Sequence, residues 1–217
     1  MGCTHEYEFE TGRLSVKNIN SIGTTLAVQA VQAIFTAKTT HSLPPSWQGA
    51  YDYDRSRSWL SSCSGDDTMV LCALDKESNA PLGLIILFEL PCAADTDQVD
   101  LRLGYVLSES SWGRGFATEL VRGLVARCRC LLVDQNSSNL ATITGGVDIT
   151  NNPASKRVLE KCGFVMLDSD DDVDVDGGSG SSSCSDGVSA SERVFQLRLS
   201  RPFSENTECL ENDRVEK

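Results

Sequence analysis

The sequence contains no apolar run that approaches the roughly 18 residues of a membrane-spanning helix. Residues 1–6 lack the apolar core of a secretory signal, and Glu6 stands where a myristoylation signal has Ser or Thr. We therefore expect a cytoplasmic protein with no membrane partner.

Paired metal-binding cysteines are also missing. The nine cysteines include no Cys-x-x-Cys pair, and Cys128 and Cys130 lie two positions apart on a predicted helix, so their side chains point in different directions. The sequence thus favours neither a metal site nor a disulfide framework. Cys72 and Cys162 lie in apolar runs and are predicted to be buried thiols.

Positive charge is scarce, because 19 Lys and Arg residues face 31 Asp and Glu residues and the net charge is −12. This balance argues against nucleic acid and anionic membranes as partners, since clustered Lys and Arg bind phosphates. Seven Asp and no basic residue fall within 168–186, which leaves the rest of the chain only mildly acidic.

The chain has 217 residues, 40 % of them hydrophobic, and is long enough for one sizeable core. Residues 1–9 are expected to be flexible, residues 10–203 to form the domain, and residues 204–217 to form a charged tail. Inside the domain, the Asp-, Gly- and Ser-rich stretch 168–191 has almost nothing to bury and is expected to be disordered.

Hydrophobic periodicity predicts a single α/β domain with a central sheet of about six to seven strands and about four helices. Apolar or alternating stretches indicate strands at 10–17, 68–74, 82–89, 100–107, 141–147, 164–167 and 194–199. Helical spacing indicates helices at 21–37, 52–62 and 116–133, and a fourth helix that Asn152 caps and Gly163 ends.

The strand at 100–107 leads through a short polar link into a glycine turn that opens the helix at 116–133. In Trp112-Gly113-Arg114-Gly115-Phe116-Ala117-Thr118, two glycines remove the Cβ atoms that would keep a ligand from the backbone. The first N–H groups of a helix have no internal partners and lie at the positive end of its dipole. The turn therefore predicts a phosphate or pyrophosphate site, to which Arg114 could add a cation.

Other interpretations of this turn remain open on the residues alone. A nucleotide P-loop needs Lys and then Ser or Thr after the second glycine, where Phe116 and Ala117 stand. A dinucleotide fingerprint needs a third glycine where Thr118 stands, and its acid, Asp134, would fall at the end of the helix instead of after a second strand. An ordinary glycine-rich turn without a ligand is the third alternative.

Two motifs resemble those of the GNAT N-acetyltransferases. They are Leu103-Gly104-Tyr105-Val106-Leu107 with the glycine turn and Glu119, and Asn152-Pro153-Ala154-Ser155 followed by RVLEKCGF at 157–164. The resemblance covers about residues 10–201 and is nearest to the Rim-type branch, which includes ribosomal-protein and other N-terminal or small-amine acetyltransferases. It implies acetyl-CoA as acyl donor, a mixed sheet splayed at the acyl-CoA site, and direct acetyl transfer to an amine.

The resemblance also implies roles for individual residues. The glycine turn would bind the pyrophosphate, the strand before it would offer backbone groups to the pantetheine arm, and Ser155 would lie beside the leaving thiolate. A hydroxyl at a helix N-terminus suits that role, although a plain capping-turn serine is the alternative. The cofactor-binding residues expected are Tyr105, Val106, Leu107, Trp112, Gly113, Arg114, Gly115, Phe116, Ala117, Thr118, Asn152 and Ser155.

The general base is not identified by these motifs. Many family members carry Glu two residues before the Gly-Tyr pair, where this chain has Arg102. Asp100, on the same strand face, is the first substitute, and Glu89, at the end of a neighbouring strand, is the second. Each of these two side chains could also be an ordinary solvated carboxylate. His41 is an outside candidate for the base. Proton transfer through water, without one dominant base, is the alternative. The predicted catalytic residues are Ser155, Asp100 and Glu89.

We therefore expect an acetyl-CoA-dependent N-acetyltransferase whose acceptor is a primary amine of a protein N-terminus or a small, for example cationic, molecule. Two other functions remain alternatives. The first is a non-catalytic acyl-CoA-binding or regulatory domain, which Arg102 in place of the usual glutamate favours. The second is a nucleotide-binding protein. The acidic stretch 168–191 would steer a cationic amine to the site, or is an inert insertion. No readable motif encodes the acceptor or the choice between monomer and homodimer.

Overall fold

A computed structural model describes residues 7–65, 68–91, 99–134, 140–167 and 192–199. Its strands are β1 (Phe9–Glu10), β2 (Leu14–Asn18), β3 (Thr68–Asp75), β4 (Pro81–Pro91), β5 (Val99–Leu107), β6 (Leu140–Asp148), β7 (Val165–Met166) and β8 (Glu192–Arg198). Its helices are α1 (Thr24–Ile34), α2 (Tyr53–Ser62), α3 (Phe116–Asp134) and α4 (Pro153–Lys161), with short 3₁₀ helices η1 (Pro45–Trp47) and η2 (Glu109–Ser111).

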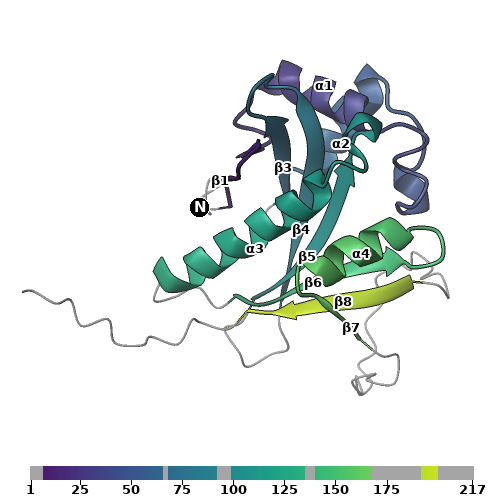
Figure 1. The fold of residues 1–217 in the computed structure, drawn as a ribbon. Helices are drawn as coiled ribbons and strands as arrows, with labels where there is room; N and C mark the ends of the chain where they lie inside the picture. The colour runs from purple at the N-terminus through teal and green to yellow at the C-terminus, as the bar shows by residue number, and fades with distance from the viewer. Residues whose placement is uncertain (1–6, 66–67, 92–98, 135–139, 168–191, 200–217) are drawn as a thin grey trace, which may run out of the picture.

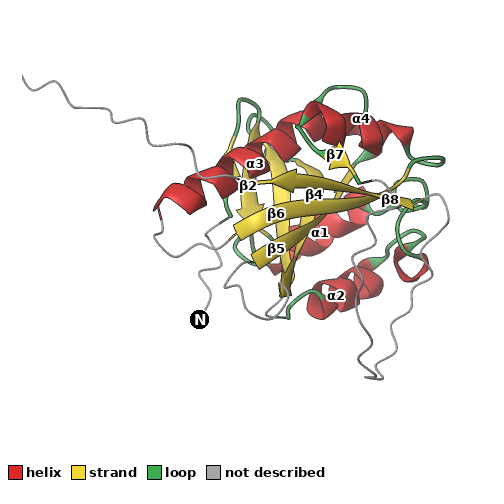
Figure 2. Ribbon diagram, turned by 90° about the horizontal axis from the view of Figure 1, so that it is seen from below, coloured by secondary structure: helices red, strands yellow, loops and turns green. Residues whose placement is uncertain are grey.

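The strands form one mixed sheet in the order β1-β2-β3-β4-β5-β6-β8-β7, in which only β5 and β6 pair in parallel among the described strands. Figure 2 shows α3 and α4 on one side of the sheet and α1 and α2 on the other, and Figure 1 shows α3 and α4 beside β5 and β6. The predicted fold class, a single α/β domain with a mixed sheet and four helices, is confirmed.

The sheet separates two hydrophobic cores, because alternate residues of a strand point to opposite faces. On β5, Leu101 and Leu103 are buried in the first core with Leu120 and Leu124 of α3, whereas Val106 is buried in the second core with α1 and α2. Burial of one such side chain stabilises the fold by roughly 1.5–3 kcal/mol. The two cores therefore fix which residues of β5 face α3 and α4.

The N-terminal region differs from the expected single strand at 10–17. It forms β1 and β2, joined by a turn in which the backbone N–H of Thr11 donates to the carbonyl oxygen of Leu14 at 2.9 Å. With this division, the described residues form eight strands instead of six or seven. Tyr7 is buried in the first core and Phe9 begins β1, so residues 7–9 are packed and differ from the expected flexible segment.

The other predicted elements are present with small shifts at their ends. For example, α1 begins at Thr24 and not at 21, because Gly23 has a φ of 85°, outside the helical range. The expected disordered stretch 168–191 and the tail 204–217 lie outside the described residues. No described helix is both long and apolar enough to cross a membrane.

The two thiols expected to be buried differ in their exposure. Cys72 is buried, and burial raises its pKa to about 12. Cys162 is only half-buried, and its Sγ donates to the carbonyl oxygen of Thr118 on α3 at 3.7 Å. Both are free thiols in the structure.

Candidate functional site

The two parallel strands of the sheet stop pairing halfway along their length. The ladder between β5 and β6 ends with Arg102 opposite Thr144, although both strands continue beyond these residues. We name the segments beyond the ladder, 103–107 of β5 and 145–148 of β6, the splay. Backbone N–H and C=O groups along the facing edges of the splay are not used by this ladder and can bind a ligand.

The glycine turn joins the end of β5 to α3. Gly113 and Gly115 have φ values of 69° and 80°, which other residues rarely adopt. Among the described residues, nothing lies within 4 Å of the position that a Cβ of Gly113 would occupy, so a ligand can approach the backbone there. The indole Nε1 of Trp112 donates to the carbonyl oxygen of Leu107 at 3.0 Å and fixes the turn on β5. These features, followed by the N-terminus of α3 at Phe116, are those of an anion-binding turn.

Two guanidinium groups flank the turn. Those of Arg13 and Arg114 lie 4.0 Å and 4.8 Å from the ring centre of Phe116. The carboxylate of Glu119 accepts hydrogen bonds from the hydroxyl of Thr11 at 2.6 Å and from the backbone N–H and Nε of Arg13 at 2.9 Å and 2.7 Å. Burial acts to raise the pKa of Glu119, but these hydrogen bonds outweigh it and lower the pKa. Glu119 thus ties the β1–β2 turn to the first turn of α3.

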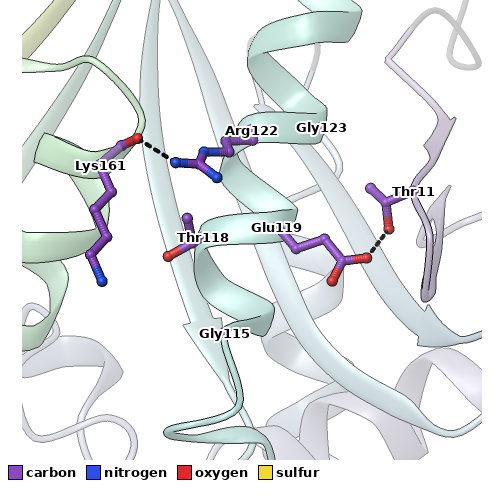
Figure 3. Close-up of a pocket in the computed structure, with 7 residues that line it drawn as sticks. All are labelled: Thr11, Gly115, Thr118, Glu119, Arg122, Gly123 and Lys161. Carbon is purple, nitrogen blue, oxygen red and sulfur yellow. Dashed lines mark hydrogen bonds between the residues drawn. The ribbon is translucent and has the colours of Figure 1, made fainter.

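A pocket of about 770 Å³ lies beside the glycine turn (Figure 3). The guanidinium of Arg122 on α3 donates to the carbonyl oxygen of Lys161 on α4 at 3.0 Å, so two basic residues stand where these helices meet at the pocket. Their charges suit a ligand with phosphate groups. The lining residues are Thr11, Gly115, Thr118, Glu119, Arg122, Gly123 and Lys161.

The N-terminus of α4 is joined to β5 by a hydrogen bond between side chains. Asn152 caps α4 as predicted, since its Oδ1 accepts from the backbone N–H of Ser155 at 3.1 Å and Pro153 follows it. The hydroxyl of Tyr105 donates to Oγ of Ser155 at 3.0 Å. Burial raises the pKa of Tyr105 to about 12, although the hydrogen bond to Ser155 acts to lower it. Tyr105 therefore stays protonated at neutral pH, and Ser155 can direct its own hydroxyl proton to another acceptor.

Comparison with known proteins assigns this geometry to a family. Residues 25–165 match the family model described as acetyltransferase (GNAT) domain. The chain belongs to the GNAT acetyltransferase family. A comparison with curated proteins finds no match.

Several solved GNAT structures have a similar fold. One is the GNAT-family acetyltransferase from Bacillus anthracis, with a TM-score of 0.62 and 15 % identity over 88 % of this chain and 98 % of that chain. Another is spermidine N-acetyltransferase from Vibrio cholerae in complex with CoA and spermine, with a TM-score of 0.60 and 14 % identity over 87 % and 97 %. A third is the GNAT phosphinothricin acetyltransferase from Sinorhizobium meliloti in complex with acetyl-CoA, with a TM-score of 0.55 and 13 % identity over 86 % and 88 %. At these identities the likeness concerns the fold.

The structure also bears on the nucleotide alternatives for the glycine turn. Thr118 lies in the first turn of α3, and Asp134 is the last residue of the same helix. The acid of a dinucleotide fingerprint follows a second parallel strand, so Asp134 does not have that place. Together with the GNAT match, this geometry favours an acyl-CoA over a dinucleotide.

The two carboxylates predicted as general bases lie before the splay. Asp100 is in the part of β5 that pairs with β6, and Glu89 is beside that part on β4. Asp100 and Glu89 occupy neighbouring positions of the β4–β5 ladder and therefore point to opposite faces of the sheet. Asp100 accepts a hydrogen bond from the hydroxyl of Thr142, and it lies about 17 Å along the strand from Tyr105. His41 is exposed in the loop after α1, where its ring contacts that loop. Along the sheet, the structure thus brings neither Asp100 nor Glu89 close to Tyr105.

Sequence reasoning missed two features of the site. It assigned only backbone groups to Tyr105, whose hydroxyl holds Ser155. It also missed Glu192, which opens β8 and forms an ion pair with Arg102, with 3.8 Å between Oε1 and Nη2. The pairing of β8 with β6 creates this contact, and strands so distant in the sequence leave no local signal of their register.

Proposed function

We propose that this protein is an acetyl-CoA-dependent N-acetyltransferase that transfers acetyl directly to a primary amine. The observation that carries the proposal is the hydrogen bond from Tyr105 to Ser155, which leaves a donor hydroxyl at the positive N-terminus of α4, next to the strand that borders the splay. Membership of the GNAT family supports acetyl-CoA as the donor, and two structures of similar fold contain CoA or acetyl-CoA.

The glycine turn and the splay would bind the cosubstrate. The backbone N–H groups of residues 113–117 and the guanidinium of Arg114 would bind the pyrophosphate. Arg122 and Lys161, at the pocket beside the turn, suit the remaining phosphate of the nucleotide. The edge of β5 that faces β6 beyond the ladder, at residues 105–107, would bind the amides of the pantetheine arm, as the resemblance to the family implies.

Acetyl-CoA supplies a thioester, whose carbonyl carbon is attacked by a neutral amine, so that a C–N bond forms and the C–S bond breaks. Negative charge then develops on sulfur. The hydroxyl of Ser155 would donate to this sulfur, because its Oγ already accepts from Tyr105. The dipole of α4 favours the same charge, and a base must take the proton from nitrogen.

The acceptor is a primary amine, on a protein N-terminus or a small molecule. We assign the enzyme to the Rim-type branch because of the Asn-x-x-Ser element at Asn152 and the sequence that follows it. A spermidine N-acetyltransferase and a phosphinothricin acetyltransferase share the fold, which supports testing polyamines and amino acids first.

Arg102 favours one second candidate, a non-catalytic acyl-CoA-binding domain. Many members of the family that this sequence resembles carry a glutamate at this position. Loss of that carboxylate would leave acetyl-CoA binding without acetyl transfer. The two candidates make the same prediction for binding of acetyl-CoA and differ only in release of CoA.

Thiol release with a panel of amines separates these functions. The purified protein is incubated with acetyl-CoA and with spermidine, L-glutamate or a peptide with a free α-amine. Released CoA is measured as free thiol, and the acetylated product is identified by mass spectrometry. Amine-dependent release of CoA supports the acetyltransferase. Thermal stabilisation by acetyl-CoA without release supports the binding domain, and stabilisation by NADH or ATP alone contradicts both, because only a ligand of the native state raises stability.

A further inference from the structure

Arg102 and Glu192 meet over β6, on the face of the sheet opposite α4. Arg102 is the last residue of β5 that pairs with β6, and Glu192 pairs with Asp148 at the end of β6. The two side chains lean toward each other along β6, so that Nη2 and Oε1 are 3.8 Å apart near Gly146. The ion pair therefore links β5 to β8 across the splay segment of β6.

Gly146 shows why the carboxylate fits there. A Cβ on Gly146 would overlap Oε1 of Glu192 and would lie 3.6 Å from Nη2 of Arg102. A Cβ on the preceding Gly145 would instead contact Leu159 of α4 at 3.4 Å. Gly146 thus faces away from α4, and the carboxylate of Glu192 lies directly against the β6 backbone of the splay.

The described residues leave this part of the sheet accessible to solvent. On this face, α1 and α2 pack on β3, β4 and β5, whose side chains form the second core. The side chains of Arg102 and Glu192 are 58 % and 29 % exposed, and Val194, two residues beyond Glu192 on the same face, is exposed. An acceptor can therefore reach the splay from this face, opposite the face on which Ser155 lies.

Resting on the proposed acetyl transfer, we propose that Glu192 is the general base and that Arg102 positions it. As the amine nitrogen attacks the thioester carbon, its proton passes to the carboxylate of Glu192 and the C–S bond breaks. The thiolate leaves with a hydrogen bond from Ser155 on the opposite face. Solvent then takes the proton from Glu192 and protonates the thiolate. Arg102 thus holds, from β5, a carboxylate that β8 supplies.

Glu192 is better placed for this step than the carboxylates predicted from the sequence. Asp100 lies two residues before Arg102 on β5, about 7 Å further from the splay, and is bonded to Thr142. Glu89 lies opposite a residue of the first core in the β4–β5 ladder, so it points to the face of α3 and α4. Only Glu192, among these three carboxylates, lies against the splay on the accessible face.

A Glu192→Gln variant tests the proposal, because it removes the charge and keeps the shape. With the best amine among spermidine, L-glutamate and a peptide α-amine, kcat/KM for the amine should fall by about 10²–10⁴-fold at neutral pH. The rising part of its pH profile should move to higher pH, because the amine must then lose its proton unaided. Glu192→Asp should retain part of the activity. The Kd for acetyl-CoA should not change, and the thermal midpoint should fall by a few degrees at most, because an exposed ion pair contributes up to about 1 kcal/mol.

The matched control is Glu10→Gln, which removes an exposed carboxylate paired with Lys76 at the far edge of the sheet and should keep wild-type kinetics. A folded Glu192→Gln variant with wild-type kcat/KM would overturn the assignment, as would a larger loss in Asp100→Asn or Glu89→Gln. Failure of the wild-type protein to release CoA with every amine would instead refute acetyl transfer itself. The two failures are therefore distinguishable.

Discussion

The hydroxyl of Tyr105 donates to Oγ of Ser155 at 3.0 Å and joins β5 to the first turn of α4. The two residues are 50 positions apart in the chain. Because burial raises the pKa of Tyr105 to about 12, the phenol acts as the donor at any physiological pH. Ser155 therefore accepts this hydrogen bond at the N-terminus of α4 and keeps its own hydroxyl proton for another acceptor.

Ser155→Ala should lower kcat by about 10²-fold, because the hydroxyl acts on charge that develops only during the reaction. The Kd for acetyl-CoA should change little, and the cap of α4 should persist, since Asn152 bonds the backbone N–H of residue 155. Ser155→Thr, which keeps a hydroxyl, is the control. Steady-state kinetics and calorimetry measure the two effects, and an unchanged kcat in Ser155→Ala would remove Ser155 from the chemistry.

Gly113→Ala and Gly115→Ala should each weaken acetyl-CoA binding and lower stability by about 1–2 kcal/mol, since both residues have positive φ. Nothing described lies within 4 Å of a Cβ on Gly113, so in this variant the cost comes from the backbone and not from a clash. Gly65→Ala is the matched control, because among the described residues nothing lies within 4 Å of its Cβ position either and Gly65 is not among the glycines with positive φ. Calorimetric Kd values and thermal midpoints test the prediction, which equal values in all three variants would contradict.

The charged carboxylate of Glu119 should stabilise the folded state at neutral pH and not at strongly acidic pH. Its folded-state pKa is lowered from the ordinary value of 4.5, because the hydrogen bonds of Thr11 and Arg13 outweigh the opposing effect of burial. The folded state therefore binds the proton less readily than the unfolded state, and this stabilisation is present above pH 4.5 and is lost as the pH falls through the folded-state pKa.

Glu119→Gln should accordingly lower the thermal midpoint at pH 7 and narrow its difference from wild type as the pH falls below 4.5. A hydrogen-bonded charge of this kind contributes about 1.5–3 kcal/mol. Glu77→Gln, which changes an exposed carboxylate in the β3–β4 turn, is the control. A difference between Glu119→Gln and wild type that stays constant from pH 7 to pH 3 would show that the charge of Glu119 is not the cause.

Features encoded by neighbouring residues could be predicted from the sequence. The glycine turn and the Asn152 cap each depend on a few consecutive residues, and the structure has both. The division of the first strand had a local signal as well, because Gly12 lies between the residues that form β1 and those that form β2. The apolar alternation before and after Gly12 concealed that turn.

Contacts set by strand register or helix docking could not be predicted. Glu192 reaches Arg102 only because β8 returns beside β6 in the register that places Glu192 opposite Asp148. The contact of Tyr105 with Ser155 likewise needs α4 to pack against β5. A shift of one residue in β8 would turn Glu192 to the opposite face, and the sequence of β8 alone does not specify the partner residues.

The charges of Arg102 and Glu192 should be coupled in catalysis if Arg102 acts through the carboxylate. Arg102→Gln should lower kcat/KM about two- to fivefold, because an exposed ion pair contributes up to about 1 kcal/mol. In the double variant with Glu192→Gln, the change at Arg102 should add almost nothing, since no base is left to position. Arg102→Lys should recover part of the loss. Kinetics of wild type, both single variants and the double variant with one amine measure the coupling, whereas independent, additive losses would show that Arg102 binds the acceptor directly.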